Sequence, residues 1–217
     1  MTREDILIQI EQCGVIPVIR GSSFEEALAL VHAIEAGGIT VFEITMTVPN
    51  ALDVLKELER ADSSGLIGAG TVLDAETARA CISAGARFVV SPAFDAATVE
   101  LCHRYGVPCF PGALTPTEVV RAWQSGASAV KIFPCSAMGG ARYIQSLKAP
   151  LPQVRMIPTG GISVASAHEF LNAGAFALGV GADLADVHAA RRGDHDKITE
   201  VARQYRAAVE NHRAAKR

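Results

Sequence analysis

The chain lacks the features that mark nucleic-acid-binding, membrane-spanning and secreted proteins. Its 217 residues carry a formal net charge of -3 and no basic run, so nothing points to binding of DNA or RNA. No apolar stretch approaches the roughly 20 residues that a transmembrane helix needs. The first residues, Met1–Asp5, carry acids and lead into no long apolar region, and we therefore expect no secretory signal.

The cysteines also lack the spacing of disulfide frameworks and metal sites. The five are scattered, odd in number and without any CxxC pair: Cys13, Cys81, Cys102, Cys109 and Cys135. Reduced thiols in a cytoplasmic protein are the simplest explanation. Hydrophobic residues make up 49% of the chain and charged residues 20%, which excludes a disordered chain and is enough for one substantial core.

Short apolar runs alternate with longer amphipathic segments along the whole chain. Because the runs lack polar alternation, they predict strands of a parallel sheet buried on both faces: Val15–Ile19, Val41–Ile44, Leu66–Gly68, Phe88–Val90, Val107–Phe110, Ala129–Phe133, Val154–Ile157 and Ala175–Val180. The segments between them predict helices: Phe24–Ala36, Ala51–Arg60, Ala75–Ala84, Ala96–Tyr105, Thr117–Ser125 and Val164–Ala173. Several begin after Asp or Ser and end in Gly, which are the residue types that cap helices.

Eight strands with intervening helices in about 200 residues predict a compact (β/α)8 TIM barrel. A doubly wound open sheet remains the alternative, because periodicity does not separate the two. We expect one domain over residues 1–217. A first helix within residues 1–14, about Arg3–Cys13, precedes the barrel and closes its bottom, residues 15–193 form the barrel, and residues 194–217 contain one exposed helix over Asp194–Lys216.

Lys131 lies inside an apolar run that otherwise predicts a buried strand. Burying an ammonium is costly, so the group is expected to have a partner or to be partly neutral. A neutral lysine in a closed pocket is a nucleophile toward carbonyl carbon. The simpler alternative is a lysine at a strand end that extends its amine into solvent.

Polar residues and glycines gather where the predicted strands end, which is where barrel enzymes have their active sites. In chain order they are Arg20, Glu43, Thr45, Thr71, Ser91-Pro92, Pro111-Gly112, Lys131, Thr159-Gly160-Gly161 and Gly179-Val180-Gly181. The loops after the seventh and eighth strands are the usual phosphate site of this fold, so their glycine amides, with a helix N-terminus behind them, predict an anion-binding cradle. Simpler explanations are that Glu43 forms a structural ion pair and that the glycines are turn residues.

Six motifs resemble those of the 2-keto-3-deoxy-6-phosphogluconate aldolases, which include 4-hydroxy-2-oxoglutarate aldolases. They are Phe42–Thr47 (FEITMT), Gly68–Val72 (GAGTV), Val90-Ser91-Pro92, Pro111-Gly112, Val130–Pro134 (VKIFP) and Pro158–Ile162 (PTGGI). The resemblance runs from about Val15 to the C-terminal helix. It implies that Lys131 is the Schiff-base lysine and that Glu43 is the acid/base residue. It also implies that a keto-acid pocket is lined by Thr71, Pro92 and Phe133, and that phosphate is bound by Gly160 and Gly161. It also implies a homotrimer that needs no metal and no other cofactor.

Two positions depart from the motifs of some family members. Thr47 stands where some have an arginine for the substrate carboxylate; we expect Arg20 to replace it, because its planar fork suits a carboxylate. A first-strand arginine is similar to that of the related 2-keto-3-deoxy-6-phosphogalactonate aldolases. Ala182 stands where some members have a phosphate-binding serine, which leaves the preference for a phosphorylated substrate open.

The resulting prediction is a metal-independent class I aldolase, a carbon–carbon lyase of the Entner–Doudoroff type. It would cleave 2-keto-3-deoxy-6-phosphogluconate or 4-hydroxy-2-oxoglutarate to pyruvate and an aldehyde, either glyceraldehyde 3-phosphate or glyoxylate. The alternatives are a phosphogalactonate-type aldolase, a phosphate-binding barrel isomerase or epimerase, and a non-catalytic sensor of sugar acids. Catalysis by the Cys135 thiol would need an activating environment, and no histidine lies near it in the sequence.

Overall fold

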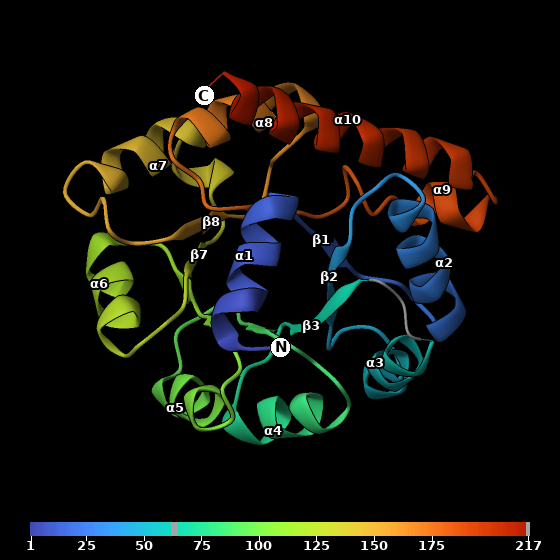
Figure 1. Cartoon of the computed structure of the whole chain (residues 1–217), viewed down its shortest axis with the longest axis horizontal. Helices are drawn as coiled ribbons and strands as arrows, with labels where there is room; N and C mark the ends of the chain where they lie inside the picture. The colour runs from blue at the N-terminus through green and yellow to red at the C-terminus, as the bar shows by residue number, and fades with distance from the viewer. Residues whose placement is uncertain (62–64, 216–217) are drawn as a thin grey trace.

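The computed structural model describes residues 1–61 and 65–215, and its strands form a ring surrounded by helices (Figure 1). Two parallel sheets make up the ring, in the orders β5-β4-β3-β2-β1-β9 and β6-β7-β8. The strands are β1 (Val15–Ile19), β2 (Val41–Thr45), β3 (Leu66–Gly70), β4 (Val89–Val90), β5 (Cys109–Phe110), β6 (Gly112–Ala113), β7 (Val130–Ile132), β8 (Met156–Pro158) and β9 (Leu178–Val180). A bridge between Thr159 and Gly179 joins the two sheets on one side.

The ring is closed on its other side at an interrupted strand. The apolar run Val107–Phe110 predicted one strand there, whereas the structure has the short strands β5 and β6 on either side of Pro111. Proline has no amide hydrogen to donate to a sheet. Its carbonyl still accepts a hydrogen bond from the Lys131 amide (3.0 Å), so the chain remains paired with β7 across the break. The predicted TIM barrel is confirmed, and the open sheet was the wrong alternative.

Helices cover the outside of the ring. They are α2 (Phe24–Glu35), α3 (Ala51–Arg60), α4 (Ala75–Ser83), α5 (Ala96–Arg104), α6 (Pro116–Gln124), α7 (Ala141–Lys148) and α8 (Val164–Asn172), with the shorter α9 (Val187–Arg191) and the 3-10 turn η1 (Ser136–Met138). The predicted caps are present: Ser23, Asp74, Asp95 and Ser163 each accept a hydrogen bond from a first-turn amide. Helix α7 was not predicted, and it begins after Gly140 without a side-chain cap.

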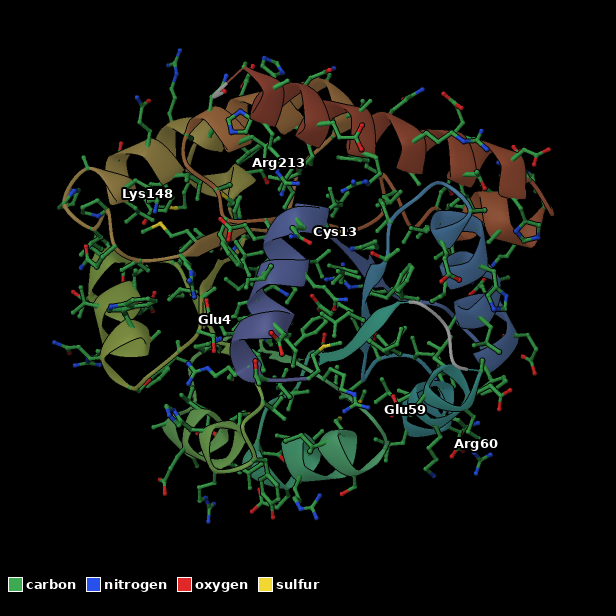
Figure 2. All side chains as sticks on the ribbon, viewed as in Figure 1. Glu4, Cys13, Glu59, Arg60, Lys148 and Arg213 are labelled. Carbon is green, nitrogen blue, oxygen red and sulfur yellow. The ribbon has the colours of Figure 1, made fainter. Side chains whose placement is uncertain are left out.

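Helix α1 (Arg3–Cys13) crosses the amino end of the barrel, where it lies over the centre of the ring in Figure 1. Its Ile6, Leu7 and Ile10 side chains are buried. Arg3 donates hydrogen bonds to Ser128 Oγ (3.0 Å) and to a backbone carbonyl, both just before β7. Figure 2 shows side chains filling the space between α1 and the surrounding strands. The prediction that the first helix closes the bottom of the barrel is therefore confirmed.

The C-terminal helix α10 (His195–Ala214) packs against α2 and α8 along one side of the barrel (Figure 1). The prediction of one exposed helix was wrong about exposure, because Ile198, Ala202, Tyr205 and Val209 form a buried face. A stripe this narrow in a mainly polar sequence does not stand out as a core-facing pattern. The predicted end of the helix at residue 216 lies outside the described residues.

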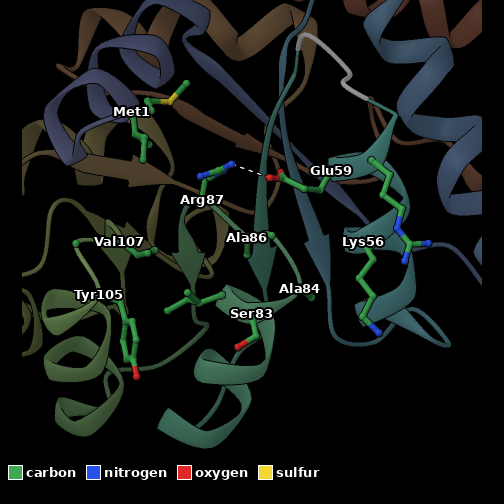
Figure 3. Close-up of a pocket in the computed structure, with 14 residues that line it drawn as sticks. Met1, Lys56, Glu59, Ser83, Ala84, Ala86, Arg87, Tyr105 and Val107 are labelled. Carbon is green, nitrogen blue, oxygen red and sulfur yellow. Dashed lines mark hydrogen bonds and ion pairs between the residues drawn. The ribbon is translucent and has the colours of Figure 1, made fainter.

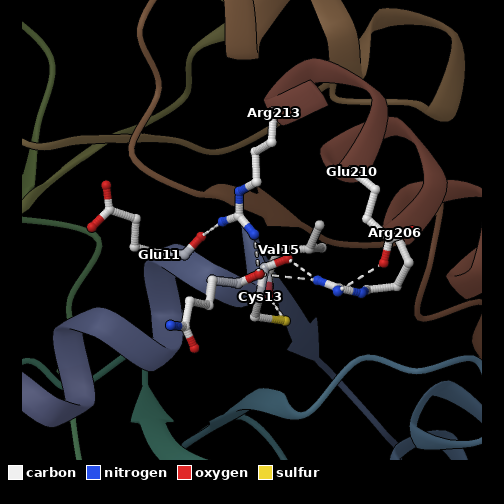
Figure 4. Close-up of polar contacts among 7 residues, drawn as sticks. Glu11, Cys13, Val15, Arg206, Glu210 and Arg213 are labelled. Carbon is white, nitrogen blue, oxygen red and sulfur yellow. Dashed lines mark hydrogen bonds and ion pairs between the residues drawn. The ribbon is translucent and has the colours of Figure 1, made fainter. Parts of the chain in front are cut away.

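Two arginines of α10 bind the carboxyl end of α1 (Figure 4). Arg206 donates to the carbonyls of Gln12 (3.1 Å) and Cys13 (2.7 Å), and Arg213 donates to those of Glu11 and Gln12. The last carbonyls of a helix have no partner within the helix, and cations complement its negative end. Through these hydrogen bonds, the C-terminal helix holds α1 in place across the bottom of the barrel. Within residues 1–61 and 65–215, no helix is both long and apolar enough to span a membrane.

Candidate active site

Lys131 of β7 and Glu43 of β2 meet inside the barrel. Their strands are not neighbours in the ring, so both side chains reach inward to come together. Lys131 Nζ lies 3.6 Å from Glu43 Oε1, and each side chain is only 3% exposed. The simpler alternative, a strand lysine that extends its amine into solvent, is therefore wrong for Lys131. The structure instead gives the buried ammonium a carboxylate partner, as burial of a charge requires.

One oxygen of Glu43 is left without a hydrogen-bond donor. Among the described residues, Oε1 is the buried side-chain polar atom for which the structure provides no such partner. A buried carboxylate oxygen without a donor is costly, and such atoms are rare outside functional sites. At 3.6 Å the lysine is an ion-pair partner beyond hydrogen-bond distance. The arrangement leaves the oxygen able to accept a proton or hydrogen bond from a third group.

Gly70 makes room for that carboxylate. The motifs in the sequence did not indicate this role of Gly70. A Cβ at residue 70 would lie 2.1 Å from Glu43 Oε1, well inside contact distance. A Cβ at Gly68, two residues earlier on β3, would lie 2.3 Å from the ring of Phe88. Glycine inside a strand commonly marks the close approach of another group. Two glycines at alternate strand positions were therefore a usable signal in the sequence.

The Phe133 ring lies beside the lysine. Its centroid is 5.5 Å from Lys131 Nζ, within the range of a cation–π contact. Phe133 also lines two hollows, one with Pro92 and Gly112 and the other with the glycine loops. Phe133 therefore contacts the lysine and also borders both of these spaces.

Thr71 adopts a strained conformation directly after β3. Its φ is +57°, in the left-handed region that β-branched residues rarely occupy. Such strain costs on the order of 1–3 kcal/mol and is concentrated at functional sites. Thr71 directly follows Gly70, the residue whose missing side chain leaves room for the Glu43 carboxylate. The strained conformation therefore lies next to that position.

The glycine loops form a hollow of about 450 Å³ at the carboxyl ends of β8, β9 and β1. Its lining includes Arg20, Thr159, Gly160, Gly161 and Gly181 together with Ala182 and Asp183. Gly160 and Gly161 have φ values of +95° and +73°, which require glycine. Arg20 is exposed, and its Nη1 lies 3.7 Å from the Cβ position of Gly181. Six of the predicted site residues, counting Phe133, thus line one hollow.

The amino end of α8 is already occupied by protein groups. The Val164 amide donates to Asp183 Oδ2 (3.2 Å), and Ser163 and Ser166 form a capping box. The helix terminus therefore lies behind the glycine loop as expected, but its Val164 and Ser166 amides already have protein partners. The cradle itself stays a prediction. Asp183 brings a carboxylate to the edge of this hollow, which no sequence motif indicated.

Thr47, at the position where some relatives have arginine, interacts with its own strand end. Its Oγ1 lies 2.6 Å from Thr45 Oγ1, and the Thr45 hydroxyl donates to the Ile19 carbonyl (2.8 Å). Ile19 directly precedes Arg20. These hydroxyls therefore support the end of β1, from which the Arg20 side chain extends.

Cys135 is buried after β7, and burial raises the pKa of its thiol to about 11. A reactive thiol needs the opposite shift, because only the thiolate is a nucleophile. A further hollow of about 480 Å³ lies at the amino ends of the strands (Figure 3), where Arg87 and Glu59 form an ion pair of 2.7 Å. None of the predicted site residues lines it.

The structure thus has a β/α barrel with a buried lysine–glutamate pair inside it. The sequence model of the KDPG and KHG aldolase family matches residues 6–201. The chain is 34% identical over 195 residues to a 2-dehydro-3-deoxy-phosphogluconate aldolase of Treponema pallidum, covering 90% of this chain and 93% of that protein. It is 33% identical to the KHG/KDPG aldolase of Escherichia coli, covering 88% of this chain and 89% of that protein.

The fold comparison agrees. The crystal structure of a KDPG aldolase from Legionella pneumophila, with pyruvate captured at low pH as a covalent carbinolamine intermediate, superposes with a TM-score of 0.84 at 31% identity. The match covers 91% of this chain and 96% of that one. The chain belongs to the KDPG and KHG aldolase family.

Proposed function

We propose that the protein is a metal-independent class I aldolase that forms a Schiff base through Lys131. Its substrates would be 2-keto-3-deoxy-6-phosphogluconate, 4-hydroxy-2-oxoglutarate or both, giving pyruvate with glyceraldehyde 3-phosphate or glyoxylate. The observation that carries the proposal is the buried Lys131–Glu43 pair, in which one carboxylate oxygen has no hydrogen-bond donor among the described residues. The phosphogalactonate analogue is the alternative substrate, since it shares the same reacting end.

The first half of the reaction uses the pair to form an imine. Proton transfer from the Lys131 ammonium to Glu43, directly or through one water, leaves a neutral amine. The amine attacks the C2 ketone to give a carbinolamine. Glu43 returns its proton to the departing hydroxyl, and water leaves as the iminium forms. The iminium is a stronger electron sink than the ketone.

The second half breaks the carbon–carbon bond. Glu43 takes the proton of the C4 hydroxyl, the C3–C4 bond cleaves to release the aldehyde, and its electron pair enters the iminium to form an enamine. The same carboxyl protonates C3, and hydrolysis then frees pyruvate and Lys131. General acid–base catalysis of this kind contributes roughly 10² to 10⁴ in rate.

The residues around the pair would orient the substrate. In this proposal Arg20 and Thr71 bind the C1 carboxylate, and Pro92 and Phe133 line the pyruvate end and exclude water. Thr159, Gly160, Gly161 and Gly181 bind the far end of the substrate. The homotrimer is part of the proposal through the motif resemblance, and the cytoplasmic location through the scattered cysteines, which suit reduced thiols.

The test is borohydride reduction in the presence of pyruvate and a metal chelator, followed by peptide mass mapping. The expected result is one stable adduct on Lys131 in the wild type and none in Lys131→Arg, which keeps the charge but forms no imine. An adduct on another lysine would reassign the nucleophile. Binding of pyruvate with no adduct would favour a sensor, and activity lost on chelation would favour a metal-using isomerase or epimerase.

A further inference from the structure

The two loops of the glycine hollow are connected from behind by the C-terminal helix. Tyr205 of α10 is completely buried, and its hydroxyl donates to Asp183 Oδ2 (2.6 Å) in the loop after β9. The same hydroxyl lies 3.4 Å from the Ile162 carbonyl in the loop after β8. One phenol group therefore contacts both loops.

Asp183 provides a second connection. The oxygen that accepts from Tyr205 also accepts from the Val164 amide at the start of α8 (3.2 Å). The carboxylate thus links the end of β9 to α8 and α10 at once. Burial and the neighbouring carboxylate raise the pKa of Tyr205, so the phenol remains a proton donor throughout the neutral range.

Packing holds only the later part of this loop, because Leu184 and Ala185 are buried in the core while Ala182 and Asp183 are exposed. Behind the glycine hollow lies a second hollow of about 470 Å³, between the loop after β9 and α10. Ser163, Ala182 and Asp183 line both hollows and so form the partition between them. A segment with space on both sides has few dispersion contacts to fix its position. The hydrogen bonds of Asp183 to Tyr205 and Val164 therefore add the contacts that this part of the loop lacks.

We propose that Tyr205 and Asp183 are positioning residues that fix the two glycine loops and thereby set the affinity for the part of the substrate beyond C4. The inference rests on the proposed function, because it assigns the glycine hollow to the far end of a keto-deoxy sugar acid. Neither residue touches the reacting atoms in this proposal. Their loss affects keto acids with an extended, phosphorylated tail and leaves the pyruvate end unchanged.

The kinetic test compares Tyr205→Phe and Asp183→Ala with Asp183→Asn, whose amide oxygen can still accept both hydrogen bonds. Thr199→Val is the matched control, since it removes another buried hydroxyl of α10 that donates only to a carbonyl of α2 (2.7 Å). In the first two variants we expect KM for 2-keto-3-deoxy-6-phosphogluconate to rise about tenfold, which is the scale of one hydrogen bond to a charged group. The kcat value and the trapping of pyruvate on Lys131 should change less than about twofold.

Amide hydrogen exchange of residues 159–166 and 181–185 gives a readout that does not depend on catalysis. Faster exchange of both segments in Tyr205→Phe and Asp183→Ala, but not in the two comparison variants, supports the positioning role. Unchanged exchange overturns it, as does faster exchange with an unchanged KM. If pyruvate trapping and the affinity for the phosphorylated substrate fall equally, the proposal is also overturned, because the substitution would then have disturbed the whole site. If wild-type protein traps no pyruvate, the proposed function fails, while the exchange result still decides whether these residues hold the loops.

Discussion

The Glu43 side chain of β2 extends over Gly70 of the neighbouring strand β3, two residues beyond its register partner Gly68, and the missing Cβ of Gly70 leaves room for the carboxylate. A Cβ at residue 70 would lie 2.1 Å from Oε1 and 2.4 Å from Cγ of Glu43. Because the added Cβ would crowd Cγ and Cδ as well as the terminal Oε1, rotation of the carboxylate alone would not relieve the overlap, and the side chain would have to move. The distance from Glu43 to Lys131 therefore depends on the absence of a side chain at a third position.

Gly70→Ala is expected to displace Glu43 and to lower kcat by about 10², within the range that general acid–base catalysis contributes. Overpacking should also lower the free energy of unfolding by about 1–3 kcal/mol. Steady-state kinetics and urea denaturation measure the two effects. Gly106→Ala is the control for crowding, because nothing lies within 4 Å of its Cβ position. Its φ of +68° makes backbone strain the cost of the added methyl group there, whereas Gly70 has no positive φ. Unchanged kcat in Gly70→Ala would show that the carboxylate position is not critical.

Glu43→Gln should keep the shape of the site and remove the base. We expect pyruvate to bind, imine formation to slow, and kcat to fall by about 10² to 10⁴. Rapid-quench borohydride trapping separates the slowed imine step from the later cleavage step. Near-normal cleavage by this variant would assign the acid–base role to another group, such as a bound water.

The Cys135 thiol should be inert at neutral pH. Since burial raises its pKa to about 11, only about one thiol in a thousand is ionised at pH 8, and the thiolate is the reactive form. Iodoacetamide at this pH should leave the native residue unmodified, and modification should appear on denaturation. Cys135→Ser is expected to retain kcat. Rapid alkylation of native Cys135 with loss of activity would revive the thiol mechanism.

The sequence predicted those features that depend on local pattern. Strand and helix order followed from apolar runs, caps and terminal glycines. The rule that barrel active sites lie where strands end then predicted that Lys131 and Glu43 come together. Each of these inferences uses residues a few positions apart or a general property of the fold.

Contacts between distant segments could not be predicted in the same way. Tyr205 and Asp183 are 22 residues apart and belong to elements whose packing depends on the finished barrel. The predicted exposure of α10 was wrong for this reason, since its apolar stripe is narrow and its partners α2 and α8 lie far away in the chain. A proline at residue 111 indicates from the sequence alone that a strand is interrupted there. The hydrogen bond from the Lys131 amide to the Pro111 carbonyl, which keeps the strands paired across the interruption, could not be predicted.

The anchoring of α1 by α10 predicts an effect on stability that is separate from catalysis. Arg206→Ala removes two hydrogen bonds to the last carbonyls of α1 and leaves the half-buried carbonyl of Cys13 without its charged partner. We expect the free energy of unfolding to fall by about 1–3 kcal/mol, with kcat unchanged. Arg203→Ala on the same helix is the matched control: its contact is a surface ion pair with Glu200 at 3.5 Å, and pairs of this kind contribute about 0–1 kcal/mol. Urea denaturation of both variants measures the difference. Equal stability of the two would mean that the hydrogen bonds of Arg206 add nothing measurable to the contacts that hold α1 across the bottom of the barrel, which include those of Arg213.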